Sequence, residues 1–563
     1  MVLKFVLLVD DDVVPAWQAH AVELLLKSKT AEIVMIVRNG APQRSPLRPS
    51  RWRQLRPRGR GLWQMFERVV ARRSLAILPT PLPVALDLVP RLTANQLLGS
   101  SRTESFTPDE MEAIRAARPD VIVRFGFGIL KGGILTVAPH GVWSFHHGDP
   151  SAIRGQPPGF WEIALELPVT GVILQRLSAE LDAGAILQRG WFGTIAHSYP
   201  RQRDQLYFGA ASWIARTSAA ILAGTLREEP QKDLGPILRK PDNMQFLWFA
   251  WKTAKATAAI HIRSLFQHQD WTVGVIKQPI AEAVHILTDE QQQNNSEIHW
   301  HVGEQGAFLA DPFPIAAGDG IRIYAERLPW RSGRGDIVAL DYSAAQGFTP
   351  LRPLWQPPYH CSYPYIFDDG ERFWCLPETS EAGEAYLFPI TDDGHVAFAS
   401  GGRVIFPDGL IDPTVIWHDD RYWMFASDPS DSNTVLNIFH AHQLIGPWVP
   451  HALNPVKTDI RSARPAGRPF ILDGSLIRPA QDCSLRYGGA ICLNQIVVLT
   501  PNDFLENVWK VIAPRRGRYR HGLHTLSWTG GWTVIDGARL KFQPAEFARA
   551  LKTKLGMTRK NQR

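Results

Sequence analysis

The sequence predicts two kinds of fold in one chain, an α/β domain with a parallel sheet followed by an all-β five-bladed propeller. Residues 3–38 show an apolar run, a helical period and a second apolar run, which together indicate a β-α-β unit. After about residue 276 the pattern changes to short aromatic and β-branched strands separated by Asp, Gly and Pro. In this second part, similar motifs return 49 to 56 residues apart, so the two parts need different architectures.

The first part continues to alternate helices and strands after residue 100, and Pro108 is well placed in the first turn of an expected helix. Short buried strands that alternate with helices are typical of a parallel sheet covered on both faces. The elements expected here are helices over 108–117, 133–137, 160–166 and 203–222, and strands over 120–125, 141–145, 171–176 and 185–190.

The repeat in the second part predicts the propeller. A period near fifty residues with several strands per unit is how propeller blades appear in sequence, and five motifs indicate five blades. Sandwiches have shorter and less regular repeats, so the propeller is preferred. The five motifs are Ala310-Asp-Pro-Phe, Ser362-Tyr-Pro-Tyr, Ile411-Asp-Pro-Thr, Gly467-Arg-Pro-Phe and Arg520-His-Gly-Leu.

A chain of 563 residues is longer than one hydrophobic core usually supports, so several domains are expected. An aromatic-rich helical stretch precedes the change of pattern and is expected to connect the two domains. The predicted divisions are an α/β domain over 1–225, a helical connector over 226–275, the propeller over 276–545 and a basic tail over 546–563.

Positive charge is concentrated rather than spread. The formal net charge is +7, yet residues 44–73 alone hold ten Arg against one Glu, with Trp52 and Trp63 among them. Such a segment suits a peripheral contact with an anionic membrane, while a solvated insertion is the plainer interpretation. Nucleic acid is not the expected partner.

Four cysteines lie in the second half without C-x-x-C spacing, which argues against a structural zinc site or a disulfide framework. No metal site is expected. The N-terminus runs directly into a strand pattern without the parts of a secretory signal. We therefore expect a cytoplasmic protein, with peripheral membrane contact as a further option.

The strand expected over 141–145 leads into His146, and Asp182 follows 36 residues later in a turn. A histidine and a carboxylate brought together at strand ends are sufficient to move a proton during acyl transfer. A single histidine in such a place is more often structural, so the hypothesis depends on the pair.

Residues 119–190 resemble the formyltransferase domain shared by methionyl-tRNA formyltransferases, glycinamide ribonucleotide transformylases and sugar N-formyltransferases. The family pattern of Asn-x-His, Arg-Gly and Leu-Asp-x-Gly is matched by Ser144-Phe-His146, Arg154-Gly155 and Leu181-Asp182-Ala-Gly184. The resemblance covers roughly residues 1–225 and implies a Rossmann-like sheet of the formyltransferase type. It also implies transfer of a formyl group from 10-formyltetrahydrofolate to an amine.

By this resemblance His146 would donate to the developing oxyanion, and Asp182 would orient the imidazole and help accept the proton. Ser144 stands where the family has Asn, and its single hydroxyl reaches less far than an amide group. The loop after His146 also differs, so either the acyl donor or the acceptor differs from the folate-using relatives. The loop supplies further substrate-binding candidates, which are His147, Asp149, Arg154 and Trp161. Asp149 and His147 are equally suited to capping a turn, and Trp161 to packing in the core.

The blades resemble five-bladed glycoside hydrolases of the arabinanase and fructosidase kind, and more closely the propeller-like N-terminal domain of plant glucosamine inositolphosphorylceramide transferases. In the hydrolases, acids on the innermost strands share the work of acid and base. The resemblance makes candidates of Asp311, Glu378, Asp412, Arg478, Asp482 and His521. Alternatively, each Asp-Pro step only begins a strand.

The leading hypothesis is an enzyme, a formyltransferase that acts on an amino sugar of a surface-glycan or glycolipid precursor while the propeller recognises the saccharide or sugar phosphate. One rival is a glycosidase or glycosyltransferase whose chemistry lies in the propeller. The other is a non-catalytic glycan-binding protein with a degenerate formyltransferase domain.

Overall fold

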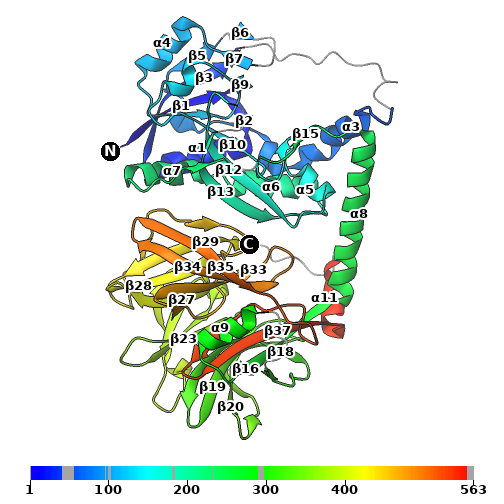
Figure 1. The fold of residues 1–563 in the computed structure, drawn as a ribbon, viewed down its shortest axis with the longest axis vertical. Coiled ribbons are helices and arrows are strands. Elements are labelled where there is room, and N and C mark those ends of the chain that lie inside the picture. Colours follow the sequence, from blue (N-terminus) through cyan, green and yellow to red (C-terminus); the bar gives the residue numbers. More distant parts are fainter. Residues whose placement is uncertain are drawn as a thin grey trace. The chain divides into compact units, whose positions relative to one another are not determined.

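The structure is a computed structural model that describes residues 2–40, 56–94, 97–98, 103–180, 184–231, 234–289 and 297–554. It consists of two compact units, Met1–Ala258 and Ala259–Arg563 (Figure 1). Within the described residues, no helix combines the length and the hydropathy needed to cross a bilayer.

The first unit is built on an eight-stranded sheet with the order β14-β13-β12-β10-β8-β1-β3-β5. The five strands from β10 to β5 pair in parallel, and β12, β13 and β14 continue the sheet antiparallel. The predicted parallel α/β sheet is confirmed, with an antiparallel edge added. The strands are β1 (Leu3–Val9), β3 (Ala31–Asn39), β5 (Arg91–Ala94), β8 (Val121–Arg124), β10 (Val142–His146), β12 (Val169–Arg176), β13 (Ala185–Gly193) and β14 (Glu229–Pro230).

Helices cover both faces of this sheet because its central strands are buried on both sides. On one face α1 (Ala16–Lys27), α6 (Tyr199–Gly209) and α7 (Trp213–Leu222) pack against inward side chains such as Trp143 and Phe145. On the other, α4 (Pro108–Ala116) packs against Val142 and its neighbours. Side chains alternate along a strand, so Ser144 and His146 of β10 belong to the α4 face.

The smaller elements of this unit are β2 (Val13–Pro15), β4 (Pro79–Pro81), β6 (Leu97–Leu98), β7 (Thr103–Ser105), β9 (Ile129–Leu130), β11 (Arg154–Gly155), β15 (Ile237–Leu238), α3 (Gly61–Val69), α5 (Phe160–Ala164), and the 3-10 turns η1 (Ala71–Arg73), η2 (Leu75–Ile77), η3 (Val84–Leu86) and η4 (Gly133–Thr136).

Two sequence predictions are corrected here. The single helix expected over 203–222 is wrong, because α6 ends at Gly209 and α7 begins at Trp213. Gly209 lies so close to β13 that a Cβ there would be 2.4 Å from the Phe192 ring, so this position needs glycine, a poor helix former.

The expected connector over 226–275 is also not a separate unit. The first half of α8 (Asn243–Phe266) packs into the first unit, where Phe249 stacks on Phe160 at 4.3 Å. The strand β16 (His268–Ile276) instead pairs with β37 (Trp532–Lys541) over nine residues and belongs to the propeller.

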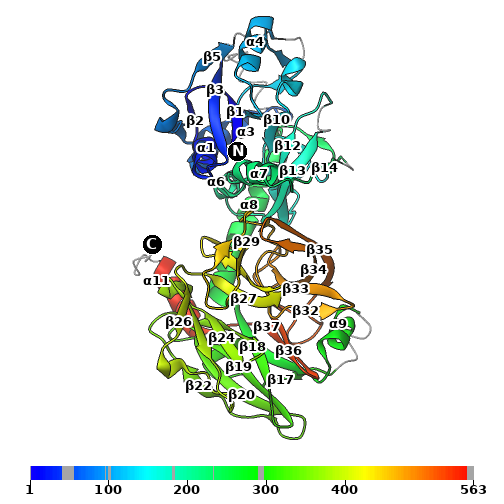
Figure 2. The same ribbon diagram turned by 90° about the vertical axis from the view of Figure 1, so that its left-hand side faces the viewer.

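The second unit is the predicted five-bladed propeller (Figure 2). The last blade joins β16 from the start of the unit to β36 and β37 from its end, which closes the ring of blades. The first three blades are β18 (Ala307–Ala317), β19 (Gly320–Pro329), β20 (Asp336–Ser343), β21 (Gly347–Phe348) and β22 (Arg352–Trp355); β23 (Ser362–Asp368), β24 (Phe373–Glu378), β25 (Ala385–Pro389) and β26 (Arg403–Phe406); and β27 (Ile411–His418), β28 (Arg421–Asp428), β29 (Asp431–Ala441), β30 (Val449–Pro450) and β31 (Lys457–Thr458).

The fourth blade is β32 (Phe470–Leu472), β33 (Ser475–Asp482), β34 (Ala490–Thr500) and β35 (Asp503–Ile512), and the fifth adds β36 (Leu526–Thr529) and β17 (His299–Trp300) to β16 and β37. Short helices and turns complete the unit: α9 (Ile280–Thr288), η5 (Ser380–Ala382), η6 (Phe398–Ser400) and α11 (Pro544–Lys554). The predicted basic tail therefore begins as a helix, and its residues from 555 lie outside the described part of the chain.

Candidate functional sites

The first candidate site lies where β8 and β10 end side by side. Arg124 is the last residue of β8 and pairs in register with Ser144 of β10. Its Nε and Nη2 atoms donate to Ser144 Oγ at 3.1 and 2.9 Å, and Nη1 donates to the Gly128 carbonyl at 2.6 Å. The carboxyl ends of parallel strands are where open α/β sheets bind ligands.

Arg124 changes what Ser144 can do at the position where the formyltransferase pattern has asparagine. A hydroxyl that accepts hydrogen bonds from a cation becomes a better donor through its own proton, because charge-assisted bonds polarise their partners. Ser144 is buried and lies next to Gln175 across the β10–β12 pair, which adds an amide to the same face. Sequence reasoning missed Arg124, although a charged residue at the end of an apolar strand is a usable signal.

His146 ends β10 on the same face as Ser144 and is half-buried. The chain folds closely over its imidazole, since a Cβ on Gly148 would lie 3.2 Å from His146 Nε2. Asp182 lies outside the described residues, so its pairing with His146 stays a prediction.

The loop after β10 holds the four other candidates of this unit. His147 stacks on Tyr207 with ring centroids 3.8 Å apart. Burial lowers the pKa of His147 to about 3, helped by the charges of His146 and Arg203, so its imidazole is neutral. Asp149 accepts from the Ser151 backbone N–H at 3.0 Å and hydroxyl at 2.7 Å, which caps the turn.

Arg154 and Trp161 also have partners within the protein. Arg154 Nε donates to the Gly235 carbonyl at 2.8 Å, and the buried indole of Trp161 donates to the Gln156 and Arg239 carbonyls at 3.2 Å each. All four side chains thus hold the loop in place, and their contact with a substrate stays a prediction.

Glu162, which the sequence analysis did not single out, is a further titratable group in this region. It is buried in the first turn of α5. Burial raises the pKa of Glu162 to about 7, and the charge of Asp149 adds to the effect. A carboxyl group that titrates near pH 7 is suited to proton exchange.

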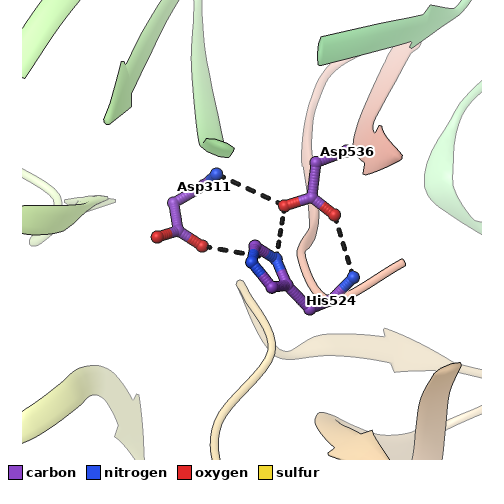
Figure 3. A group of neighbouring side chains, drawn as sticks. All are labelled: Asp311, His524 and Asp536. Carbon is purple, nitrogen blue, oxygen red and sulfur yellow. Dashed lines mark hydrogen bonds and ion pairs between the residues drawn. The ribbon is translucent and has the colours of Figure 1, made fainter. Parts of the chain in front are cut away.

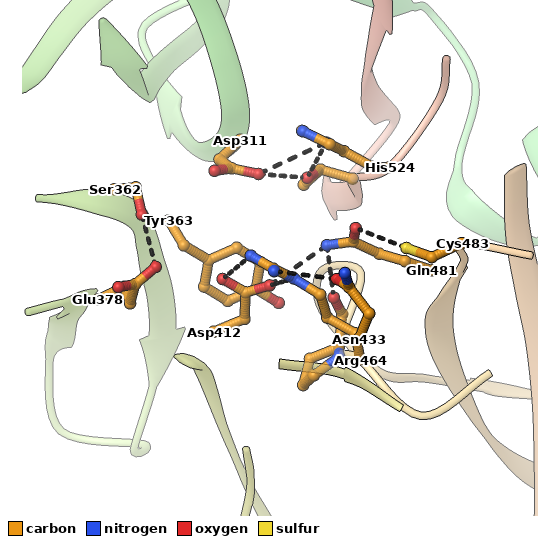
Figure 4. Close-up of polar contacts among 12 residues, drawn as sticks. Asp311, Ser362, Tyr363, Glu378, Asp412, Asn433, Arg464, Gln481, Cys483 and His524 are labelled. Carbon is orange, nitrogen blue, oxygen red and sulfur yellow. Dashed lines mark hydrogen bonds and ion pairs between the residues drawn. The ribbon is translucent and has the colours of Figure 1, made fainter. Parts of the chain in front are cut away.

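The second candidate site is the centre of the propeller, to which every blade contributes (Figure 4). Asp311, Tyr363 and Asp412 each precede a proline on the innermost strand of their blade and adopt positive φ angles of 52°, 42° and 50°. The strand pairing is interrupted by a bulge at each of the three positions. Non-glycine residues with positive φ angles lower stability and concentrate at functional sites. This favours a functional role for these three side chains. Arg464 and His524 are the contributions of the fourth and fifth blades.

One part of the cluster is a histidine between two carboxylates (Figure 3). His524 Nδ1 lies 2.5 Å from Asp536 Oδ2 and 3.6 Å from Asp311 Oδ1, and all three residues are buried. Asp536 also accepts the backbone N–H groups of His524 and Thr525 at 2.8 and 3.1 Å. Burial alone would lower the pKa of His524, but the two carboxylates outweigh it and raise the pKa.

The other part is a buried ion pair. Arg464 Nε lies 2.6 Å from Asp412 Oδ2, and its Nη1 donates to Asn433 Oδ1 at 3.3 Å. Gln481 donates to the same Asp412 oxygen at 3.2 Å. Burial raises the pKa of Asp412 to about 7, with Arg464 opposing the shift and Glu378 and Asp311 adding to it.

Glu378 lies close enough to share this electrostatic environment and is held by the hydroxyls of Ser362 at 2.8 Å and Ser380 at 2.6 Å. Burial also raises the pKa of Glu326 far above its usual value, and the charges of Asp311, Glu378 and Asp412 increase that shift. The structure therefore brings together three of the six predicted propeller residues, Asp311, Glu378 and Asp412.

The other three predicted residues have different partners. Arg478 is buried against Glu506, with Nη2 2.6 Å from Glu506 Oε1. Asp482 accepts from the Ser484 backbone N–H at 2.9 Å, and His521 contacts Arg486 at 3.2 Å. The residues that sequence reasoning missed are Glu326, Tyr363, Arg464, His524 and Asp536. Tyr363 lies within a predicted motif, His524 directly follows the last motif, and Arg464 stands three residues before the motif at Gly467. The spacing alone was too coarse to select them.

Comparison with known proteins matches each unit to a different relative. Residues 293–525 match the family described as glucosamine inositolphosphorylceramide transferase 1, N-terminal. The transferase of that name from Oryza sativa subsp. japonica is 30% identical over 262 residues, covering 42% of this chain and 34% of its own length. The chain therefore spans about a third of that plant relative.

A methionyl-tRNA formyltransferase from Xanthomonas campestris pv. campestris is 33% identical over 285 residues, which cover 48% of this chain and 85% of that protein. Among solved structures, a thermostable family-43 glycoside hydrolase is similar over 38% of this chain and 78% of its own, with 15% identity and a TM-score of 0.30. The extent of the formyltransferase match identifies the family. The chain belongs to the formyltransferase family, and its formyltransferase domain is joined to a five-bladed propeller similar to the N-terminal domain of glucosamine inositolphosphorylceramide transferases.

Proposed function

We propose that the protein transfers a formyl group from 10-formyltetrahydrofolate to the amine of an amino sugar on a surface-glycan or glycolipid precursor. The propeller binds the saccharide. The observation that carries this proposal is the fusion itself, in which a formyltransferase-family domain shares a chain with a propeller whose centre is lined by polar groups from every blade.

The chemistry at the end of β10 follows from what the reaction demands. An amine that attacks a formyl carbon creates a tetrahedral oxyanion and must lose a proton. His146 and the Arg124-polarised hydroxyl of Ser144 lie on one face and supply donors for the oxyanion. Asp182, by resemblance, orients the imidazole and helps it accept the proton.

The same donor set fits the proposed cofactor. 10-Formyltetrahydrofolate supplies an activated formyl group when bound, and a formyl oxygen needs donors that are already in place. Ser144 and His146 would face that oxygen, while Arg124 holds the Ser144 hydroxyl in one orientation.

The propeller centre is better suited to binding than to hydrolysis. Polyhydroxylated ligands are recognised by convergent polar groups, and this centre offers carboxylates, an amide, a guanidinium and a phenol. Hydrolysis needs one carboxylic acid free to protonate the leaving group. Here Asp311, Glu378 and Asp412 already have protein partners at 2.6 to 2.8 Å. Glu326, whose raised pKa keeps it protonated, is buried.

The deciding experiment incubates the full chain with 10-formyltetrahydrofolate and nucleotide-linked amino sugars, and measures formamide formation by mass spectrometry. We expect formylation of a free amino sugar and none of its N-acetylated form. Methionyl-tRNA serves as a second acceptor, because the bacterial relative is named for it. Transfer to tRNA alone, or to no amine at all, would contradict the proposal.

We also propose that the first unit contacts an anionic membrane surface from the cytoplasmic side, where the four unpaired cysteines remain reduced. Of the predicted arginine-rich segment, residues 41–55 with Trp52 lie outside the described part, and Trp63 is buried in the core. The described remainder includes exposed Met65 and Val69 on α3 among exposed arginines.

A stripe on α8 supports the same contact. Met244, Leu247, Trp248 and Trp251 follow helical spacing and are 52 to 58% exposed. Lys252 Nζ lies 4.6 Å from the Trp248 ring centroid and is paired with Glu166, while Lys255 one turn along is 58% exposed. Tryptophan flanked by lysine is typical of helices that lie in the membrane interface.

Replacing both Trp248 and Trp251 with serine is expected to lower binding to phosphatidylglycerol vesicles at least tenfold. Each replacement removes a large apolar surface that the membrane would cover in the bound state. Co-sedimentation measures this, with phosphatidylcholine vesicles for comparison. Trp417→Ser is the matched control, since Trp417 is 54% exposed on the propeller. Equal binding by the double variant and the wild type would exclude α8 as the contact.

A further inference from the structure

A cavity of about 370 Å³ lies beside the last blade of the propeller, and its lining includes none of the residues proposed above for formyl transfer. Its lining combines an apolar floor, which includes Trp300, Leu523 and Ile535, with three arginines, Arg515, Arg516 and Arg518. We propose that this cavity binds a phosphorylated small molecule, with the phosphoryl group at the arginines and a sugar or base ring on the aromatic floor.

The floor is built by glycines that let an indole lie against the sheet. A Cβ on Gly274 would be 2.8 Å from the Trp300 ring, and one on Gly537 would be 2.6 Å from it. Any larger residue at either position would displace the indole. Trp300 in turn contacts Tyr519, with centroids 4.6 Å apart. Two joined aromatic rings on a fixed support form a surface on which a ring can pack.

The rim carries positive charge without a matching acid. Residues 513–523 contain four arginines and no Asp or Glu. In the described part of the chain, Arg516 and Arg518 form no ion pair with a carboxylate, and both are exposed. Asp536 also lines the cavity, but its carboxylate is bound by His524 and by two backbone N–H groups. The site therefore has guanidinium donors in excess.

This arrangement suits a phosphoryl group. A planar guanidinium presents paired N–H groups that match two phosphate oxygens at once. Burial lowers the pKa of Arg515, and a bound anion would favour its charged form. Because the floor is apolar and aromatic, inorganic phosphate alone would use only half of the site.

The test measures binding by isothermal titration to the full-length protein, with glucose 1-phosphate, UMP, inorganic phosphate and uncharged glucose as probes. We expect glucose 1-phosphate or UMP to bind at least tenfold more tightly than phosphate and glucose, and to weaken as salt rises. The tighter of the two distinguishes a sugar phosphate from a nucleotide. Equal affinity for glucose and glucose 1-phosphate would overturn the proposal.

The double variant Arg516→Gln/Arg518→Gln is expected to lose at least tenfold in affinity for the phosphorylated probe. Both side chains are exposed, so the fold is retained, which circular dichroism checks. Arg403→Gln is the matched control, an exposed arginine on β26 in another blade. Unchanged binding by the double variant would also overturn the proposal, whatever the formyl-transfer assay shows.

Discussion

Replacement of His146 with alanine is expected to lower formyl transfer by about 10²- to 10⁴-fold, the usual contribution of a positioned acid or base. His146 ends β10 on the face that carries Ser144 and Arg124, so its loss removes the proton carrier and a donor to the oxyanion together. The side chain is only half-buried, so the fold is expected to survive. Single-turnover formamide formation by the variant measures the effect.

Two matched variants separate this interpretation from its rivals. Arg124→Met removes the cation behind Ser144 and is expected to lower turnover by about 10- to 100-fold, a smaller loss because the hydroxyl remains. Asp311→Asn changes the propeller centre and is expected to raise the KM for the saccharide while kcat is retained. If Asp311→Asn abolishes activity and His146→Ala does not, the chemistry lies in the propeller.

The fold class could be predicted because the two parts of the sequence show different patterns of apolar residues and motifs. Buried strands next to helical patterns gave the parallel sheet, and motifs near fifty residues apart gave the five blades. The predictions that failed concerned features that depend on tertiary contacts. The break after Gly209 depends on its contact with the Phe192 ring in β13. The last blade includes β16, which follows α8 directly in the sequence but pairs with β37 near the end of the chain.

The residues at the propeller centre also divide into those that the sequence predicted and those that it did not. Asp311 and Asp412 were predictable because an Asp-Pro step recurs at twice the blade spacing. Arg464 and His524 were not, because loops of different length bring them to the centre. Arg478 was selected for its place in a motif, yet alternation along β33 turns its side chain toward Glu506.

The Arg478 ion pair gives the largest expected effect on stability. Glu506 is buried between two cations, with Oε1 2.6 Å from Arg478 Nη2 and 2.7 Å from Lys457 Nζ. Replacing Glu506 with alanine is expected to lower the unfolding free energy of the propeller by about 3–5 kcal/mol, because it leaves the buried guanidinium of Arg478 uncompensated. Urea denaturation followed by tryptophan fluorescence measures the change. Glu506→Gln keeps the shape and isolates the charge.

The pH dependence of stability gives a second test of this ion pair. Burial alone would raise the pKa of Glu506, but Arg478 and Lys457 outweigh it and hold the pKa at about 2, below the usual 4.5. A carboxyl group with a lowered folded-state pKa stabilises the protein above its unfolded pKa and loses that contribution as pH falls through the folded value. Wild-type stability should therefore decline between pH 4.5 and 2 by about 3 kcal/mol more than that of Glu506→Gln. Glu23→Gln is the exposed control, since Glu23 pairs with Lys27 at a similar 2.7 Å but in solvent, where a much smaller change is expected. If the Glu506→Gln and wild-type curves run parallel, burial of this ion pair does not stabilise the blade.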